Sequence, residues 1–205
     1  MLIVFDLDHT LFNTDFLKRD FCDVFSRCGV PEDTFWQTFH QSYDMNPSEP
    51  GTYAIEKHLT IVPSLTSKKK TEIHEALVNT VMSRGVQYLY PEVLAVLAEL
   101  KQNHDLYLVT KGNDSFQKLK ISATNIGHLF KEIFIVSQTK EQVLKKITAG
   151  KGRVINVNDR HDELSSVRNA FANVYSVLIR RQRNDQQTDL PVINNLREVA
   201  VYMKK

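Results

Sequence analysis

The segment that most constrains this chain is Phe5-Asp6-Leu7-Asp8-His9-Thr10-Leu11, which directly follows the apolar residues 2–4. A short apolar run is typical of a buried strand, so the two aspartates stand where a strand gives way to a loop. Residues two apart point to the same side of a strand, and Asp6 and Asp8 are therefore expected to face one cavity. In open parallel sheets, that cavity lies outside the carboxyl ends of the strands. Two neighbouring carboxylates repel each other, so the pair needs a metal ion, a proton or a substrate to offset its charge.

Size and charge exclude several classes of protein. The chain has 205 residues, 42% of them hydrophobic, and a formal net charge of +2. This length allows one large domain or one domain with a smaller insertion. A nearly neutral charge gives no reason to expect nucleic acid or a membrane surface as partner, and no segment resembles a signal peptide or a membrane span. Cys22 and Cys28 match neither a zinc site nor a redox pair, and such free thiols predict a cytoplasmic location.

Hydrophobic periodicity predicts a helical region after the first strand. Over residues 13–89, apolar side chains recur three to five positions apart, as on the buried face of a helix. Helices are expected over 52–59 and 67–84, with Pro31 opening an earlier one and a loop at 46–51. We expect this region to form a small helical bundle.

From residue 91 the pattern alternates between helices and short apolar runs. Strands are expected over 106–109, 133–136, 154–157 and 174–179. Helices are expected over 91–102 and 114–124, and Thr139 with Gln142 fits a capping box that opens a third. The alternation predicts an α/β fold in which helices cover both faces of a parallel sheet.

The first motif also carries a family resemblance. Asp6-Leu7-Asp8-His9-Thr10, placed after an N-terminal strand, resembles the D-x-D-x-T motif of haloacid dehalogenase-like (HAD) phosphatases. The resemblance covers essentially the whole chain. It implies a HAD-like Rossmannoid core formed by residues 1–12 and 90–205, a helical cap domain formed by residues 13–89, and a role for Thr10 in holding the loop. The alternative makes both aspartates solvated turn acids and Thr10 a helix cap.

Two later positions match phosphate-binding residues of the family. At the end of the strand before residue 110 the family places a Ser or Thr, and here Thr110-Lys111-Gly112 occupies that position. The glycine lets the backbone turn closely around an anion. The resemblance implies that Thr110, Lys111 and Gly112 bind the substrate phosphate, and that Lys140 neutralises the phosphate and the nucleophile. The alternatives are a polar turn and a surface lysine.

The fourth loop departs from the family pattern. The family shows Gly-Asp followed four residues later by another acid, and here Asp159 and Glu163 have that spacing. Asn158 replaces the glycine, and Glu163 replaces the commoner aspartate. Asp159 is expected to bind the metal ion, with Glu163, or else Asp162, in a supporting role. Alternatively, these acids only stabilise the start of a helix through its dipole.

The resemblance implies a covalent route for phosphate ester hydrolysis. Asp6 attacks phosphorus and forms an aspartyl-phosphate, while Asp8 protonates the leaving oxygen and then deprotonates the attacking water. Mg²⁺ is expected on the Asp6 carboxylate, the Asp8 backbone carbonyl and Asp159. Lys140 and Thr110 would stabilise the charge of the transferred group.

Other activities of the family remain open from the sequence. Its dehalogenase branch generally lacks the second acid, so Asp8 favours a phosphatase acting on a small phosphorylated metabolite. Phosphomutases share both acids. Asn158 and Glu163 also leave room for a catalytically degenerate protein that binds a phosphorylated ligand or a protein partner.

Three further groups of residues have a simple expected location. The aromatic set Phe35, Trp36, Phe39 and Tyr43 is expected to form bundle core rather than to line a substrate pocket. The basic runs 68–70 and 180–183 are expected to lie on the solvated surface.

Overall fold

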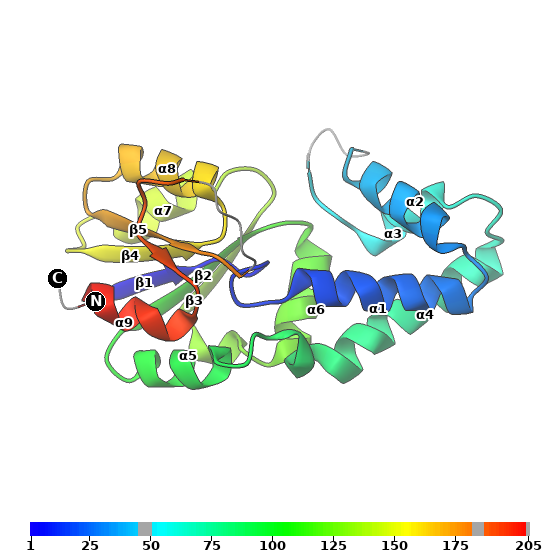
Figure 1. The fold of residues 1–205 in the computed structure, drawn as a ribbon, viewed down its shortest axis with the longest axis horizontal. Coiled ribbons are helices and arrows are strands. Elements are labelled where there is room, and N and C mark those ends of the chain that lie inside the picture. Colours follow the sequence, from blue (N-terminus) through cyan, green and yellow to red (C-terminus); the bar gives the residue numbers. More distant parts are fainter. Residues whose placement is uncertain (45–50, 182–186, 204–205) are drawn as a thin grey trace.

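A computed structural model of the protein describes residues 1–44, 51–181 and 187–203. Its centre is a parallel sheet with the strand order β3-β2-β1-β4-β5-β6 (Figure 1). The strands are β1 (Leu2–Phe5), β2 (Asp105–Lys111), β3 (Glu132–Val136), β4 (Val154–Asn158), β5 (Val174–Ile179) and β6 (Val192–Ile193). The predicted α/β fold class is therefore confirmed. The short strand β6 was not predicted, because two residues are too few for a periodic signal.

Side chains alternate between two hydrophobic layers, one on each face of the sheet. Ile3 and Phe5 of β1 point into the larger layer, beneath α5 (Val93–Lys101), α6 (Asp114–Thr124) and α9 (Val199–Met203). Leu2 and Val4 point into the smaller layer, beneath α7 (Glu141–Thr148) and α8 (His161–Ala170). Burial on both faces explains why the strand sequences are continuously apolar.

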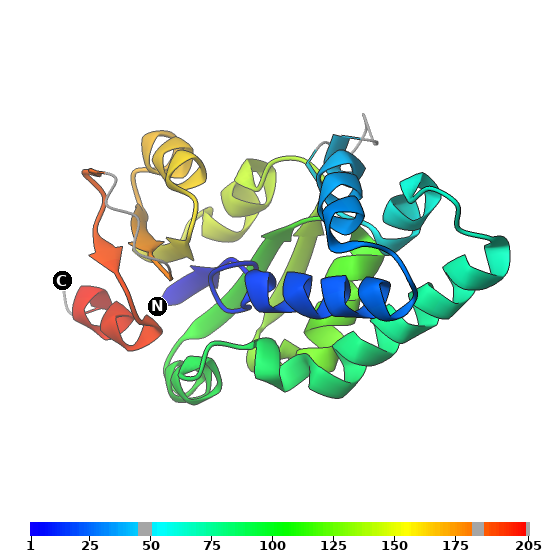
Figure 2. The same cartoon turned by 45° about the vertical axis from the view of Figure 1, so that its right-hand side comes forward.

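Four helices form a bundle beside the sheet, as Figures 1 and 2 show. They are α1 (Thr14–Arg27), α2 (Glu32–Asp44), α3 (Ile55–Ile61) and α4 (Ser67–Arg84). Short 3₁₀ turns complete the fold at η1 (Gly85–Tyr88), η2 (Gly127–Leu129) and η3 (Leu196–Glu198). No helix in the described part of the chain is long and apolar enough to cross a membrane.

The segments that lead into and out of the bundle lie side by side. The Asn13 amide donates to the Tyr88 carbonyl at 2.6 Å, and the Tyr90 amide donates to the Leu11 carbonyl at 3.1 Å. Phe12 and Leu89 form an antiparallel bridge between these two hydrogen bonds. The chain therefore leaves and re-enters the sheet region at one place.

Several predicted element boundaries agree with the structure, and others differ from it by one or more residues. The helices at 67–84 and 114–124 and the strand at 174–179 are confirmed. The helix expected at 52–59 begins only at Ile55, because Ala54 is extended. The Thr139–Gln142 capping box is wrong: α7 begins at Glu141, and Lys140 occupies the N-cap without a side-chain bond. Most of the loop expected at 46–51 lies outside the described residues.

Candidate active site

The carboxyl ends of β1, β2 and β4 border a cleft of about 600 Å³. Helices α1, α2 and α6 form its other walls. Asp6 and Asp8 from the loop after β1 line this cleft together with Lys140 and Asp159. They meet because β1 lies between β2 and β4, so adjacent strand ends bring distant parts of the sequence together.

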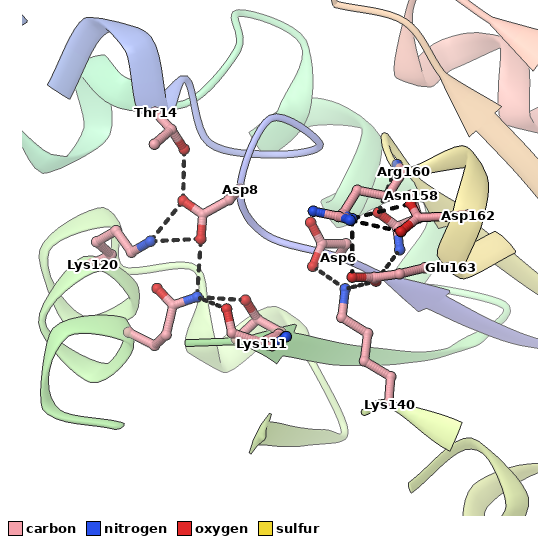
Figure 3. A network of polar contacts seen from close by, with 12 residues as sticks. Asp6, Asp8, Thr14, Lys111, Lys120, Lys140, Asn158, Arg160, Asp162 and Glu163 are labelled. Atoms are coloured by element: carbon pink, nitrogen blue, oxygen red, sulfur yellow. Dashed lines mark hydrogen bonds and ion pairs between the residues drawn. The ribbon is translucent and has the colours of Figure 1, made fainter. Parts of the chain in front are cut away.

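Asp6 lies against Lys140, which stands at the start of α7 (Figure 3). The Lys140 Nζ is 2.5 Å from Asp6 Oδ1 and 2.9 Å from Glu163 Oε2. Burial raises the pKa of Asp6, and Lys140 only partly opposes this effect. Burial alone would lower the pKa of Lys140, but Asp6 and Glu163 raise it above its usual value. Lys140 is therefore a fixed positive charge beside the expected nucleophile.

Asp8 has a separate set of partners, and its carboxylate is turned toward Thr14 and Lys120 in Figure 3. The Lys120 Nζ lies 2.6 and 2.7 Å from its two oxygens, and the Thr14 hydroxyl donates at 2.6 Å. Burial favours the protonated acid, but Lys120, Thr14 and Gln117 together lower the pKa of Asp8 to about 2. Both aspartates thus line one cleft, as predicted, but each has its own lysine.

The sequence analysis did not identify Lys120 or Gln117 as site residues. Lys120 is only 2% exposed, and its ammonium lies 5.0 Å from the centre of the Phe116 ring. Both residues point inward from α6, the helix that follows Thr110-Lys111-Gly112. A possible signal was their three-residue spacing, which continues to Ile121 and Thr124 on the same buried helix face.

Gln117 joins the loop after β2 to Asp8. Its Nε2 lies 2.9 Å from Asp8 Oδ2, 2.7 Å from Thr110 Oγ1 and 3.0 Å from the Lys111 carbonyl. A Cβ on Gly112 would stand 2.8 Å from the Gln117 side chain, so this close approach requires glycine. The structure thus places Lys111 and Gly112 at the cleft, as predicted. Thr110 does not line the cleft: it is fully buried, and its hydroxyl accepts from Gln117.

The fourth loop brings Asp159 and Glu163 to the cleft but not Asp162. Burial, followed by the charge of Asp6, raises the pKa of Asp159 to about 7. The Asn158 amide donates to Glu163 Oε2 at 2.9 Å, so the two atypical residues contact each other. The Asp162 side chain is 68% exposed and pairs with Arg160 at 2.6 Å. The structure therefore favours Glu163 over Asp162 as the supporting acid.

The arginine Arg181, whose side chain is buried, contacts the first loop through the backbone of Thr10. Among the described residues, the Thr10 hydroxyl has no hydrogen-bond partner, but its carbonyl accepts from Arg181 Nε at 3.0 Å and Nη2 at 2.6 Å. Arg181 also pairs with Glu92 at 2.5 Å, and its side chain is 5% exposed. The prediction that Arg181 is solvated is therefore wrong, because Glu92 supplies a buried counter-charge. Gln182 and Arg183 lie outside the described residues.

The donors at the strand ends suit a hard cation better than a transition metal. In the described chain, no three His, Cys, Asp or Glu side chains converge on a point that could hold a metal ion. Asp6 and Asp159 are nevertheless neighbouring oxygen donors, from the ends of the adjacent strands β1 and β4. Mg²⁺ is bound by few protein carboxylates and retains several waters. These two carboxylates could therefore hold it.

Comparisons with known proteins agree with this fold. A family model described as haloacid dehalogenase-like hydrolase matches residues 3–187. A solved structure from Burkholderia xenovorans LB400, named as a hydrolase of this family, is 17% identical, covering 98% of this chain and 94% of that chain with a TM-score of 0.76. The HAD-hydrolase YfnB from Bacillus subtilis, solved with bound magnesium and reported to show interdomain movement, is 15% identical, with coverages of 100% and 98% and a TM-score of 0.69.

The matched structures have names from more than one branch of the family. One from Haemophilus somnus 129pt, named as a predicted phosphoglycolate phosphatase, is 18% identical, with coverages of 98% and 97% and a TM-score of 0.60. Dehalogenases are also among them, and no curated protein matched the sequence. At these identities the solved structures share the fold alone. The family model spans most of the sequence, however, and the chain therefore belongs to the haloacid dehalogenase-like hydrolase family.

Proposed function

We propose that the protein is a Mg²⁺-dependent phosphatase that hydrolyses a small phosphorylated metabolite through an aspartyl-phosphate on Asp6. The observation that supports this best is the pair of acids with separate partners in one cleft, Asp6 with Lys140 and Asp8 with Lys120. A dehalogenase has no leaving alkoxide to protonate, so it has no use for an acid at the position of Asp8. Separate partners allow the two carboxylates to differ in function.

The charges of the buried acids at the site suit a bound Mg²⁺. Asp159 forms no ion pair with any residue that the structure describes, whereas Asp6 and Glu163 share Lys140. Burial and the charge of Asp6 raise the pKa of Asp159, and Lys140 opposes this only in part. A cation held by Asp6 and Asp159 would offset the remaining repulsion. Asp6, Asp159 and the backbone carbonyl of Asp8 would hold the ion. When bound, Mg²⁺ would draw charge from the phosphate oxygens as a Lewis acid.

The protein's own residues supply the nucleophile, the phosphate-binding groups and the proton-transfer group. An Asp6 oxygen attacks phosphorus, and Lys140 offsets negative charge on the nucleophile and the phosphate. Lys111 and Gly112 bind the other phosphate oxygens. Asp8 gives a proton to the leaving oxygen and later takes one from the attacking water. Because Lys120 holds Asp8 ionised in this conformation, the first of these steps requires Asp8 to move away from Lys120 and gain a proton.

Residues 13–89 act in this proposal as a cap over the site. The two segments that connect the core to the bundle are joined by the bridge between Phe12 and Leu89. This bridge lies at the predicted limits of the core, residues 12 and 90. Rotation at this bridge would move α1 and α2, which wall the cleft, relative to Asp6. The interdomain movement reported for the B. subtilis structure supports such closure, which would exclude water and select the substrate.

The test is Mg²⁺-dependent release of phosphate from a generic aryl phosphate. Asp6→Asn should abolish release with little loss of thermal stability, because it removes a buried charge. Asp162→Asn is the matched control, since this acid is exposed and does not line the cleft. Wild-type turnover in Asp6→Asn, or no Mg²⁺-dependent release by the unmodified protein, would reject the proposal.

The alternatives to a phosphatase are a phosphomutase and a catalytically degenerate binding protein, and the contact between Asn158 and Glu163 argues against the second. A phosphomutase would return the phosphoryl group to substrate instead of water. A degenerate phosphate-binding protein is suggested by Asn158 and Glu163, but Asn158 directs Glu163 onto Lys140. These departures therefore form one joined arrangement around the expected catalytic lysine. A cytoplasmic location remains a prediction from the sequence.

A further inference from the structure

Beyond Asp8, the cleft is walled by aromatic rings from separate parts of the chain. They are Phe21 of α1, Phe39 and Tyr43 of α2, Tyr53 before α3, and Phe116 of α6. We call this part the aromatic chamber. Tyr53 stands at its centre, with its ring centroid 4.8 Å from that of Phe39 and 5.1 Å from that of Phe116. The predicted bundle aromatics are therefore divided, because Phe39 and Tyr43 line the cleft while Phe35 and Trp36 do not.

A buried hydrogen-bond chain engages the hydroxyl of the central tyrosine. The Tyr53 hydroxyl lies 3.0 Å from Nδ1 of the fully buried His58, whose Nε2 lies 2.9 Å from the Thr38 hydroxyl. Thr38 donates its proton to the Thr34 carbonyl at 2.7 Å, so His58 Nε2 is the donor and Nδ1 accepts from Tyr53. Burial lowers the pKa of His58 to about 4, consistent with a neutral ring. Tyr53 therefore offers the cleft its ring rather than its hydroxyl.

Two polar groups beside the chamber, the Lys18 ammonium and the Asn113 side-chain oxygen, are engaged within the protein. The Lys18 ammonium lies 3.1 Å from Asp15 Oδ1. Asn113 Oδ1 caps α6 by accepting from the Phe116 amide at 3.1 Å and also accepts from Ser115. A ligand with several hydroxyl groups would lose its water here and find few partners in return, which is unfavourable. An apolar ring would instead gain contact with the surrounding rings.

We propose, building on the phosphatase function above, that the group released from phosphate is a flat apolar ring that occupies the aromatic chamber. The substrate class is a phosphate monoester of an aryl or arylalkyl alcohol, and phosphates of sugars and polyols are poor substrates. In this arrangement, the phosphate lies against Asp6 while the ring extends past Asp8 between α1, α2 and α6. A cleft of about 600 Å³ has the size typical of small-ligand sites.

The first experiment compares benzyl phosphate with glycerol 3-phosphate. Both release an alkoxide, so the comparison depends mainly on how the released group is bound. We expect kcat/KM at least about tenfold higher for benzyl phosphate. Phe39→Leu and Phe116→Leu should each reduce this ratio severalfold. Trp36→Leu is the matched control on α2, since Trp36 contacts Phe39 but does not line the cleft, and it should keep the wild-type ratio.

A binding experiment needs neither turnover nor a substituted protein. With Mg²⁺ present, calorimetry should show benzylphosphonate binding at least about tenfold more tightly than 2-hydroxyethylphosphonate. If aryl phosphate is hydrolysed but glycerol 3-phosphate matches or exceeds benzyl phosphate, the chamber assignment is overturned and the phosphatase stands. If benzylphosphonate binds preferentially while no ester is hydrolysed, the phosphatase fails and the chamber stands. If neither preference is observed, the chamber assignment is wrong.

Discussion

The buried pair Arg181–Glu92 should contribute far more to stability than any surface ion pair. Each of the two side chains is 5% exposed, and Arg181 reaches both Glu92 and the carbonyl of Thr10. The Arg181 guanidinium also lies 4.0 Å from the centre of the Tyr90 ring. Arg181→Met would keep an unbranched side chain but remove every one of these donors. It would leave the Glu92 carboxylate buried, with the Leu196 amide at 3.0 Å still donating to it.

The expected loss is large for a domain of this size. Removing one partner of a buried ion pair costs roughly 3–5 kcal/mol, because the other charge remains buried and uncompensated. The total stability of a domain is about 5–15 kcal/mol. For about 200 residues, each kcal/mol shifts the melting temperature by about 2–4 °C, so Arg181→Met should melt roughly 6–20 °C lower. Arg168→Met is the control, since its pair with Asp189 is similarly short at 2.7 Å but exposed, and should cost about 1 kcal/mol or less.

The loss should depend on pH with a definite sign. Burial alone would raise the pKa of Glu92, but Arg181 and the Leu196 amide hold it below its usual value. Glu92 therefore stabilises the fold above its unfolded pKa, and this contribution is lost as pH falls through its folded pKa. Without Arg181, burial raises the pKa of Glu92, and protonation of its carboxylate removes the free-energy cost of the buried charge. The difference between the unmodified protein and Arg181→Met should thus shrink from pH 7 toward about pH 4.

Urea unfolding of a double-mutant cycle tests this reasoning. Adding Glu92→Gln to Arg181→Met removes the orphaned charge and should recover part of the lost stability, so the two losses should not add. A loss below about 1 kcal/mol for Arg181→Met at pH 7, or simple additivity with Glu92→Gln, would show that Arg181 and Glu92 are not a coupled buried ion pair.

Three further variants test the cleft. Lys120→Met removes the cation beside Asp8 and should raise the pKa of Asp8 above about 2, measured by NMR titration of the carboxyl carbon, whereas an unchanged pKa would show that Lys120 does not hold Asp8 ionised. Gly112→Ala places a Cβ against Gln117 and should weaken inhibition by inorganic phosphate severalfold, whereas unchanged inhibition would remove this loop from the phosphate site. Asp159→Asn should raise the Mg²⁺ concentration needed for half-maximal rate while the protein in chelator melts no lower, because repulsion between buried acids is relieved.

Residues at strand ends were predictable because their position follows from local patterns. A short apolar run marks each strand, and the carboxyl ends of parallel strands meet at one edge of the sheet. Asp6, Thr110 and Asp159 directly follow such runs or end them. The structure accordingly brings Asp6 and Asp159 to one cleft edge, and Lys140 reaches it from the start of α7. Thr110 lies behind this edge, buried against the cleft residue Gln117. The sequence order of loops was therefore sufficient to gather these four residues.

Lys120 and Arg181 could not be found in the same way, because their burial depends on distant partners. A lysine within a helix and an arginine in a basic run both resemble solvated surface. Lys120 pairs with Asp8, 112 residues away in the sequence, and Arg181 pairs with Glu92, 89 residues away. These pairings allow both cations to be buried. Charged side chains are seldom buried without such a partner. Only the packing of α6 and of the chain after β5 against the first loop reveals the pairing.

These two pairings explain how one loop can hold two acids in different states. Lys140 neutralises Asp6 only partly, because it also meets Glu163, so Asp6 keeps a raised pKa that a bound cation can lower. Lys120 meets Asp8 alone among the carboxylates described, and with Thr14 it keeps Asp8 ionised. The two acids are two residues apart, yet their environments push their pKa values in opposite directions. The proposed roles need the reverse order, with an ionised nucleophile and a protonated acid. A cation bound at Asp6 and a movement of Asp8 away from Lys120 would supply that order.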